Sequence, residues 1–157
     1  MYHDTVGNNA VLELDFAIDR DGLVNPTHAT MYTRLGQWIQ ECYATPIVPA
    51  SYSTKKVGDT TWEYTLVASA ASAWTSITTD RVVMREDYSK GGQYVRSWKL
   101  SVNGNATASG TSIGNRKVSV FETLVSAPTS ITMVLTVTAV AEPNMLQFDM
   151  FHPCRKE

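Results

Sequence analysis

The chain has 157 residues, which is enough for one domain, or one domain with an appendage, to bury a hydrophobic core. Its formal net charge of −2 argues against a nucleic-acid partner, because nucleic-acid-binding proteins usually carry a basic surplus. No segment approaches about 18 uninterrupted apolar residues and no basic and apolar leader opens the chain, so the sequence predicts neither a membrane span nor a signal peptide.

The first predicted element is a buried strand that ends in a tight acidic turn. Residues 11–18 are mostly apolar, although Glu13 and Asp15 interrupt the run. The stretch Asp19-Arg20-Asp21-Gly22 ends the strand, because aspartate favours turns and glycine adopts a positive φ at no steric cost.

A helix is expected directly after this turn. Asn25 offers an N-cap, and Pro26 suits the first helical position because its missing N–H would have no partner there. The helix should end near Tyr43, since Thr45-Pro46 follows. Its apolar residues form one stripe at helical spacing, made of Met31, Leu35, Trp38, Ile39 and Cys42.

From residue 46 onward the apolar period changes to two, which is typical of half-buried strands. In one of these strands Tyr94, Arg96, Trp98, Leu100 and Val102 should share a face. The sequence therefore predicts a mainly β fold, a sandwich of two antiparallel sheets over residues 46–157 after a strand–turn–helix extension over residues 1–45. The predicted strands are 62–68, 81–84, 94–102, 117–121, 131–140 and 145–151.

The two cysteines, Cys42 and Cys154, lie far apart and lack metal-type spacing. They are either two free thiols or one disulfide that joins the C-terminal tail to the helix. The triplet Asn105-Ala106-Thr107 makes Asn105 a candidate N-glycosylation site in a secreted chain. We therefore expect an extracellular or secretory location.

Several stretches of the sequence resemble α-L-fucosidases, which are retaining glycoside hydrolases with a TIM-like barrel. "YHDTVGNNAVLELDFAIDRDGLV" and "RLGQWIQECYATPI" are similar to the strand and helix that end this barrel. "DRVVMREDYSKGGQYVRSW", "ASGTSIGNRKVSVF" and "AEPNMLQFDMF" are similar to segments of the C-terminal β-sandwich. The resemblance implies a discoidin-like jelly-roll sandwich after residue 50, preceded by the last strand and helix of a barrel.

Three departures from the family pattern lie in the predicted strand. Asp15 replaces the strand-ending asparagine, Ala17-Ile18 replaces a pair of prolines, and Glu13 replaces a leucine. A charge at position 13 is unfavourable inside a parallel strand covered on both faces. We interpret it as a sign that the rest of the barrel is absent.

No catalytic constellation is expected in this chain. A retaining fucosidase needs two carboxyl groups roughly 5–5.5 Å apart, and the resemblance implies that both lie on earlier barrel strands, which no segment here matches. Asp19 and Asp21 are interpreted as turn formers. Glu86 and Asp87 are neighbours on a strand, so they point to opposite faces, and we expect them to brace the following loop.

No metal or other cofactor is expected either. Gly58-Asp59-Thr60-Thr61 offers a single carboxylate, too few for a calcium loop. The three histidines have no partner at metal-ligand spacing and are His3, His28 and His152.

Sugar binding is the leading functional hypothesis. It requires an aromatic face and charged or amide groups on loops over a rigid scaffold. The candidates are Trp74, Arg85, Tyr88, Tyr94, Arg96 and Asn115. Each also has a structural alternative: Trp74 can plug a sheet end, the arginines can pair with Glu86 or Asp87, and Asn115 can supply a turn. The expected protein is a non-catalytic, lectin-like binder of glycans.

Two other functions remain open at this point. The chain can be a C-terminal fragment or subunit of a fucosidase that needs a second chain for hydrolysis, or a structural assembly module without a ligand. A homo-oligomer is expected with the lectin, because weak single-sugar sites gain avidity from multivalency. Its contact surface should be residues 7–43, since one strand and one amphipathic helix cannot bury their own apolar faces.

Overall fold

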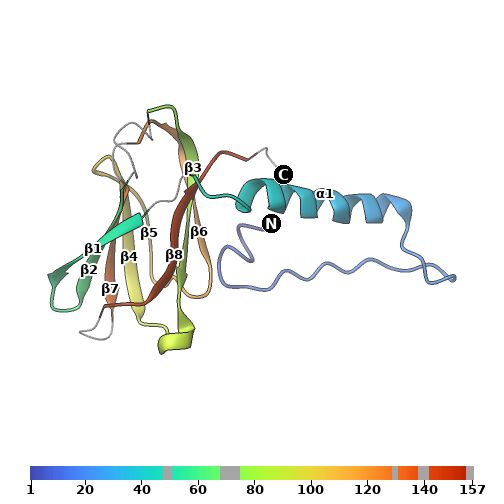
Figure 1. Ribbon diagram of the computed structural model, residues 1–157. Helices are drawn as coiled ribbons and strands as arrows, with labels where there is room; N and C mark the ends of the chain where they lie inside the picture. Colours follow the sequence, from blue (N-terminus) through green and yellow to red (C-terminus); the bar gives the residue numbers. More distant parts are fainter. Residues whose placement is uncertain (48–50, 68–74, 129–130, 138–141, 155–157) are drawn as a thin grey trace.

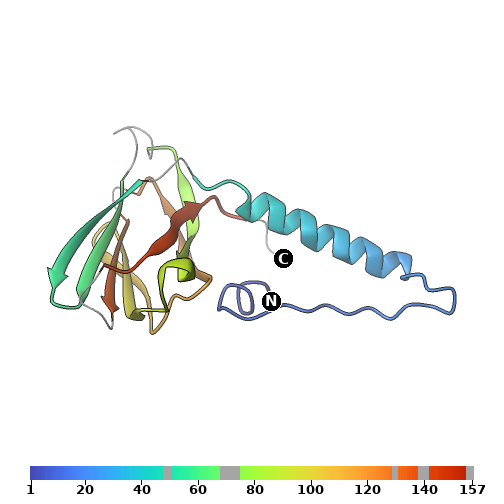
Figure 2. The same cartoon turned by 60° about the horizontal axis from the view of Figure 1, so that its bottom comes forward.

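The structure is a computed structural model that describes residues 1–47, 51–67, 75–128, 131–137 and 142–154. Its described part is mainly β, with one α-helix near the N-terminus and antiparallel strands after it. The N-terminal segment runs beside the helix, and both project from the sheets as an arm (Figures 1 and 2). We call residues 1–47 the arm and the strands that follow it the sandwich.

The arm contains the predicted helix, α1, which spans Pro26–Tyr43. The side chain of Asn25 accepts the backbone N–H of Thr27, which confirms the predicted cap. The predicted turn is also confirmed, because the Asp19 carboxylate accepts the N–H groups of Asp21 and Leu23 and Gly22 has a φ of +77°.

The predicted buried strand at residues 11–18 is wrong. This segment is extended, yet its ladder contact in the described structure is a single bridge between Ile18 and Val24. Leu12, Leu14 and Phe16 are half-buried, whereas Val11 is 88% exposed. The sequence does carry a strand-like pattern, but a strand needs a hydrogen-bonded neighbour, and the described residues supply none along residues 11–17.

Five strands form the larger sheet, in the order β1-β2-β7-β4-β5, and every pairing is antiparallel. Three more form the smaller antiparallel sheet, in the order β6-β3-β8. The strands are β1 Ser51–Gly58, β2 Thr61–Val67, β3 Thr78–Glu86, β4 Val95–Val102, β5 Asn105–Gly110, β6 Lys117–Ser126, β7 Ile131–Val137 and β8 Met145–Phe151, with the short 3-10 helix η1 at Tyr88–Lys90.

One hydrophobic core lies between the two sheets. Tyr64 and Leu100 contribute from the larger sheet, and Met84 and Phe148 contribute from the smaller one; all four are almost completely buried. This shared core confirms two packed antiparallel sheets. The more specific description, a discoidin-like jelly roll, stays a prediction.

Neither β1 nor β5 was predicted from the sequence, and both are edge strands of the larger sheet. The described β1 side chains are exposed, and β5 has small or polar residues in the sequence NATASG. An edge strand buries little apolar surface, so its sequence need not show the alternation of apolar and polar residues that is typical of a half-buried strand.

Arg96 was predicted to share the core face of its strand with Trp98, and this prediction is wrong. The register of β4 against β7 shifts between Val95 and Ser97, so that Val95 is buried and Arg96 is exposed. A bulge of this kind inserts one residue and reverses which side chains face the core. Trp98, Leu100 and Val102 do face the core as predicted.

Candidate functional site

Of the six predicted sugar contacts, the structure brings two together. Arg85 at the end of β3 donates from Nε to the backbone oxygen of Asn115 at 2.9 Å, and a second guanidinium nitrogen lies 3.5 Å from the Asn115 side-chain oxygen. They line a shallow pocket of about 230 Å³ together with Val6, Asn9, Ala10, Val11 and Arg116. We call it the Arg85–Asn115 pocket.

Of the other four candidates, the three that the structure describes do not line this pocket. Trp74 lies outside the described residues. Tyr88 is exposed on η1, and Arg96 is exposed on β4. Tyr94 is half-buried and packs against the core. The predicted site is therefore not one continuous surface in the described structure.

Glu86 organises the loops at this end of the sandwich. Its side chain is 3% exposed and accepts the backbone N–H groups of Tyr94, Val95 and Gly114 at 2.9–3.0 Å. Asp87 accepts the N–H of Ser89 and so caps η1. The prediction that this acidic pair braces the following loop is confirmed.

The Gly-Asn-Asn run at residues 7–9 fastens the arm to the sandwich. Val118 donates its N–H to the Gly7 oxygen at 2.8 Å. The Asn9 side chain accepts the N–H of Arg116 and donates to the Ile113 oxygen, both at 2.8 Å. Gly7 must lack a side chain, since a Cβ there would lie 2.4 Å from the His3 oxygen.

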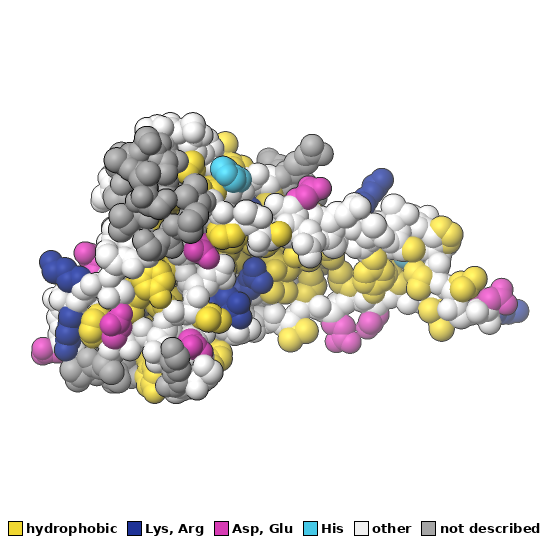
Figure 3. All heavy atoms as spheres, viewed as in Figure 1, with side chains coloured by type: hydrophobic (Ala, Val, Ile, Leu, Met, Phe, Trp, Pro, Cys, Tyr) yellow, Lys and Arg dark blue, Asp and Glu magenta, His cyan; other side chains and the backbone are white. Residues whose placement is uncertain are grey.

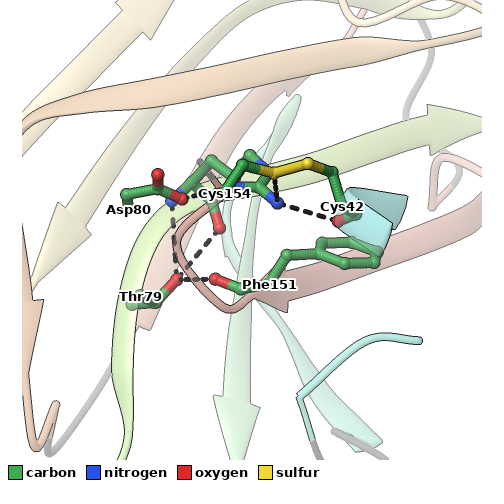
Figure 4. Close-up of polar contacts among 6 residues, drawn as sticks. Cys42, Thr79, Asp80, Phe151 and Cys154 are labelled. Carbon is green, nitrogen blue, oxygen red and sulfur yellow. Dashed lines mark hydrogen bonds and ion pairs between the residues drawn. A yellow bond between two sulfur atoms is a disulfide. The ribbon is translucent and has the colours of Figure 1, made fainter. Parts of the chain in front are cut away.

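A disulfide between Cys42 and Cys154 joins the end of α1 to the chain after β8 (Figure 4). Of the two alternatives that the sequence left open, the structure contains the bridge. Arg81, only 1% exposed, donates to the Cys42 oxygen at 2.8 Å and to the Cys154 sulfur at 2.6 Å, and it pairs with Asp80. One buried guanidinium thus connects the arm, the smaller sheet and the C-terminal tail.

Aromatic rings fill the base of the arm. Tyr43 packs 5.2 Å from Tyr2 and 5.7 Å from Phe151, measured between ring centroids. The Arg81 and Arg116 guanidinium groups lie 4.9 Å and 5.3 Å from the Tyr43 ring. Burial raises the pKa of the Tyr43 hydroxyl above its ordinary value, although the two arginines act in the opposite direction.

Farther out, the arm exposes an apolar groove between its extended segment and α1. The groove has a volume of about 320 Å³ and is lined by Tyr2, Val6, Leu12, Leu14, Tyr32, Leu35, Gly36 and Ile39. Hydrophobic side chains run along the arm on the face that Figure 3 shows. Beyond the groove, Ile18, Leu23 and Met31 are each more than half exposed. This surface is unusually apolar for a free domain.

A further pocket, which was not predicted from the sequence, lies between the larger sheet and the start of β8. It has a volume of about 240 Å³ and is lined by Tyr52, Tyr64, Asp87, Glu142, Pro143, Asn144 and Met145. The Tyr64 hydroxyl donates to the Pro143 oxygen at 2.8 Å, and the Tyr52 hydroxyl donates to the Met145 oxygen at 3.1 Å. No sequence motif marks this pocket, because its residues come from β1, β2, the end of β3 and the approach to β8.

Among the residues that the structure describes, no group of three or more His, Cys, Asp or Glu side chains gathers as a metal site would. In the same part of the chain, no helix is long and apolar enough to cross a membrane.

The fold of this chain is similar to part of several solved structures. The chain matches no protein-family model, and it matches no curated protein. Among solved structures, a Ruminococcus gnavus fucosidase of glycoside hydrolase family 29, determined in complex with fucose, has a TM-score of 0.78 and 17% identity over 96% of this chain and 35% of its own.

Two further structures agree with this result. A family 29 glycoside hydrolase from an unknown rumen bacterium has a TM-score of 0.74 and 23% identity over 99% of this chain and 28% of its own. A Bacteroides thetaiotaomicron protein assigned as an α-L-fucosidase has a TM-score of 0.71 and 23% identity, covering 97% of this chain and 32% of its own. This chain thus has the fold of one part of these proteins, arm included, and spans about a third of their length.

Proposed function

We propose that this chain is the non-catalytic C-terminal part of a fucosidase-type assembly, in which the arm completes a barrel whose other strands lie outside residues 1–157. The observation that carries the proposal is the extended segment at residues 11–17. None of its backbone N–H groups donates a hydrogen bond to another described residue. Unpaired strand edges of this kind accept neighbouring strands.

The side chains of the segment support the same proposal. Leu12, Leu14 and Phe16 turn toward α1, and Phe16 packs on His28 and Tyr32 with ring centroids 4.7 Å and 4.3 Å apart. One strand covered on one face by one helix is the repeating unit of a β/α barrel. Such a unit needs neighbours on both strand edges, and the sandwich supplies none in the described structure.

The absence of catalysis in the isolated chain is part of the proposal. Two carboxylates considered as catalytic candidates make structural hydrogen bonds. Asp19 accepts two backbone N–H groups in the turn of the arm, and Glu86 accepts three backbone N–H groups in the sandwich. Hydrolysis of a fucoside would therefore require carboxylates from the completing barrel.

Native mass spectrometry of the complex isolated from its source tests this proposal. The expected result is the 17.3 kDa chain in stoichiometric association with further polypeptide, covalent or not, that contains the remaining barrel strands. That assembly should release fucose from an aryl α-L-fucoside, whereas residues 1–157 alone should not. A particle made only of simple multiples of 17.3 kDa would instead support a homo-oligomer formed through residues 7–43.

A lectin-like function is the second candidate, and the Arg85–Asn115 pocket is the observation that favours it. Two residues predicted for sugar binding on chemical grounds lie together there, beside the amide of Asn9. A glycan array with the wild-type chain and Arg85→Ala tests this function. Saturable binding that Arg85→Ala abolishes would support it, and no binding by the wild-type chain would rule it out.

We also propose an extracellular or secretory location. Disulfides persist mainly in oxidising compartments, and Cys42–Cys154 is one. Asn105 is exposed at the start of the edge strand β5, where an attached glycan would have room. A mass decrease on treatment of the native protein with an N-glycosidase, lost in Asn105→Gln, would support this location.

A further inference from the structure

A small pocket at the base of the arm lies between α1, the N-terminal segment and the loop before β6. It has a volume of about 180 Å³. Its lining contains no aspartate or glutamate and consists of Tyr2, Ile39, Gln40, Tyr43, Ala44 and Arg116. A pocket of this size is small for a drug-sized ligand, but it has room for a small ion with some of its water.

Two hydrogen-bond donors among these residues lack an acceptor. The Tyr43 hydroxyl and the Nε of Arg116 are both buried, and neither has a hydrogen-bond partner among the described residues. The Gln40 side chain lines the same pocket, and its amide can donate as well. Because a buried donor without an acceptor is costly, an acceptor bound at this place would stabilise the folded chain.

The pocket also has a positive charge that no described residue neutralises. The Arg81 and Arg116 guanidinium groups lie 4.9 Å and 5.3 Å from the Tyr43 ring centroid. Arg81 is ion-paired with Asp80, whereas Arg116 forms no ion pair in the described part of the chain. The C-terminal end of α1 opposes this charge with about half an elementary charge, which is less than the charge of one guanidinium. The local potential therefore favours an anion.

An anion satisfies these groups better than a water molecule does. The guanidinium of Arg116 has only donors, and the Tyr43 hydroxyl and the Gln40 amide can each donate, so the pocket needs a centre that accepts several hydrogen bonds. A water molecule must also find acceptors for its own hydrogens, and it leaves the charge of Arg116 in place. A halide ion accepts from all three groups and offsets the charge.

We propose that this pocket binds one small monovalent anion of the size of chloride, held by the Tyr43 hydroxyl, the Gln40 amide and the Arg116 guanidinium. These residues come from α1 and from the loop before β6, so the bound anion joins the base of the arm to the sandwich. The site depends on neither proposed function. Arg116 also borders the Arg85–Asn115 pocket, but Arg85 and Asn115 do not line the anion site.

NMR of the ³⁵Cl nucleus in the presence of the full chain tests the proposal. Bound chloride relaxes rapidly, so its exchange with free chloride broadens the chloride resonance. The wild-type chain should broaden this resonance saturably, with a Kd on the order of 10 mM, as expected for a site of a few hydrogen bonds. Chloride should also raise the melting temperature of the wild-type chain, because a ligand that binds only the folded state stabilises it.

Two variants and a matched control locate the site. Arg116→Met, which removes the charge and keeps much of the side-chain length, should weaken chloride binding at least about tenfold. Tyr43→Phe keeps the ring and removes only the hydroxyl, and it should weaken binding by about threefold or more. Arg96→Met removes the same charge from an exposed position on β4 and should bind chloride as the wild-type chain does.

Circular dichroism shows whether each variant is folded, and Tyr43→Phe keeps the test decisive if Arg116→Met is not. Absence of saturable broadening by the wild-type chain would overturn the proposal. The same loss of binding in Arg96→Met as in Arg116→Met would overturn it too, because the effect would then be one of net charge. Unchanged binding in a folded Arg116→Met or Tyr43→Phe chain would place the chloride elsewhere and have the same consequence.

Discussion

At the scale of single residues, Glu86 connects the loops at one end of the sandwich. A carboxylate that accepts three backbone N–H groups in a buried position replaces hydrogen bonds that water would otherwise make. It connects the start of β4 with the turn before β6, so it also positions Asn115, which adjoins Gly114. The Arg85–Asn115 pocket therefore depends on a residue that does not line it.

Glu86→Ala should lower the free energy of unfolding by roughly 3 kcal/mol, because it leaves two buried N–H groups and one partly buried N–H group without an acceptor. Urea denaturation followed by tryptophan fluorescence measures the change. Glu122→Ala is the matched control, since Glu122 is exposed on β6 and its replacement should change stability by less than about 0.5 kcal/mol. Equal effects of the two substitutions would contradict the structural role of Glu86.

Tyr43 gives a prediction for alkaline pH. Burial raises the pKa of its hydroxyl in the folded state, whereas an unfolded tyrosine ionises near pH 10. The folded state therefore favours the neutral form; this contribution to stability is complete below about pH 10 and is lost as pH rises above it. The free energy of unfolding should fall more steeply above pH 10 in the wild-type chain than in Tyr43→Phe, and identical slopes would refute this assignment.

At the scale of elements, the arm is held to the sandwich at its base and is open along its length. The base has the disulfide, the Arg81 hydrogen bonds and the aromatic rings around Tyr43. Beyond it, the extended segment contacts α1 and has no strand partner in the described structure. The contacts at the base fix the orientation of the arm relative to the sandwich. The backbone hydrogen-bonding groups of the extended segment remain free to pair with another strand.

Removal of the disulfide in a Cys42→Ala/Cys154→Ala double variant should lower the free energy of unfolding by roughly 4 kcal/mol. The value lies at the upper end of the usual range because the two cysteines are 112 residues apart, so the bridge restricts a long loop in the unfolded chain. A reducing agent should produce a similar loss in the wild-type chain and no further loss in the double variant. A loss below about 1 kcal/mol would show that Arg81 and the aromatic contacts hold the arm without the bridge.

Hydrogen exchange should separate the arm's extended segment from the sandwich. In the isolated chain the amides of residues 11–17 should exchange almost as fast as those of an unstructured peptide, because they donate no hydrogen bond to a described residue. Amides of the central strands β4 and β7 should be protected. In an assembly that completes the barrel, residues 11–17 should become protected too, and protection in the isolated monomer would contradict the open edge.

At the scale of the whole molecule, a sandwich with a closed core carries an arm with an open apolar groove. The sandwich buries residues from both sheets in one core, whereas the groove along the arm leaves apolar side chains open to solvent. Leu35 lies in the groove. Leu35→Ser should therefore weaken the association of the arm with the partner polypeptide proposed above at least tenfold, while the sandwich stays folded. Analytical ultracentrifugation and circular dichroism measure the two quantities. Val120→Ser, an exposed apolar residue on β6, is the control and should leave association unchanged.

The sequence by itself determined the local features of this protein. The Asp19–Gly22 turn, the Asn25 cap, the extent of α1 and the core face of β4 from Trp98 onward depend on residues a few positions apart, and local rules reach that far. The resemblance to fucosidases also came from short motifs that keep their order along the chain.

Only the tertiary structure decided which residues meet. It showed that Arg96 is turned outward by a bulge, that Arg85 and Asn115 form a pocket without the other candidates, and that residues 11–17 are not paired as a strand within the described part. It also joined Cys42 to Cys154 and brought Tyr52 beside Glu142 and Asn144. These outcomes depend on the register and packing of segments distant in the sequence, which a local pattern does not encode.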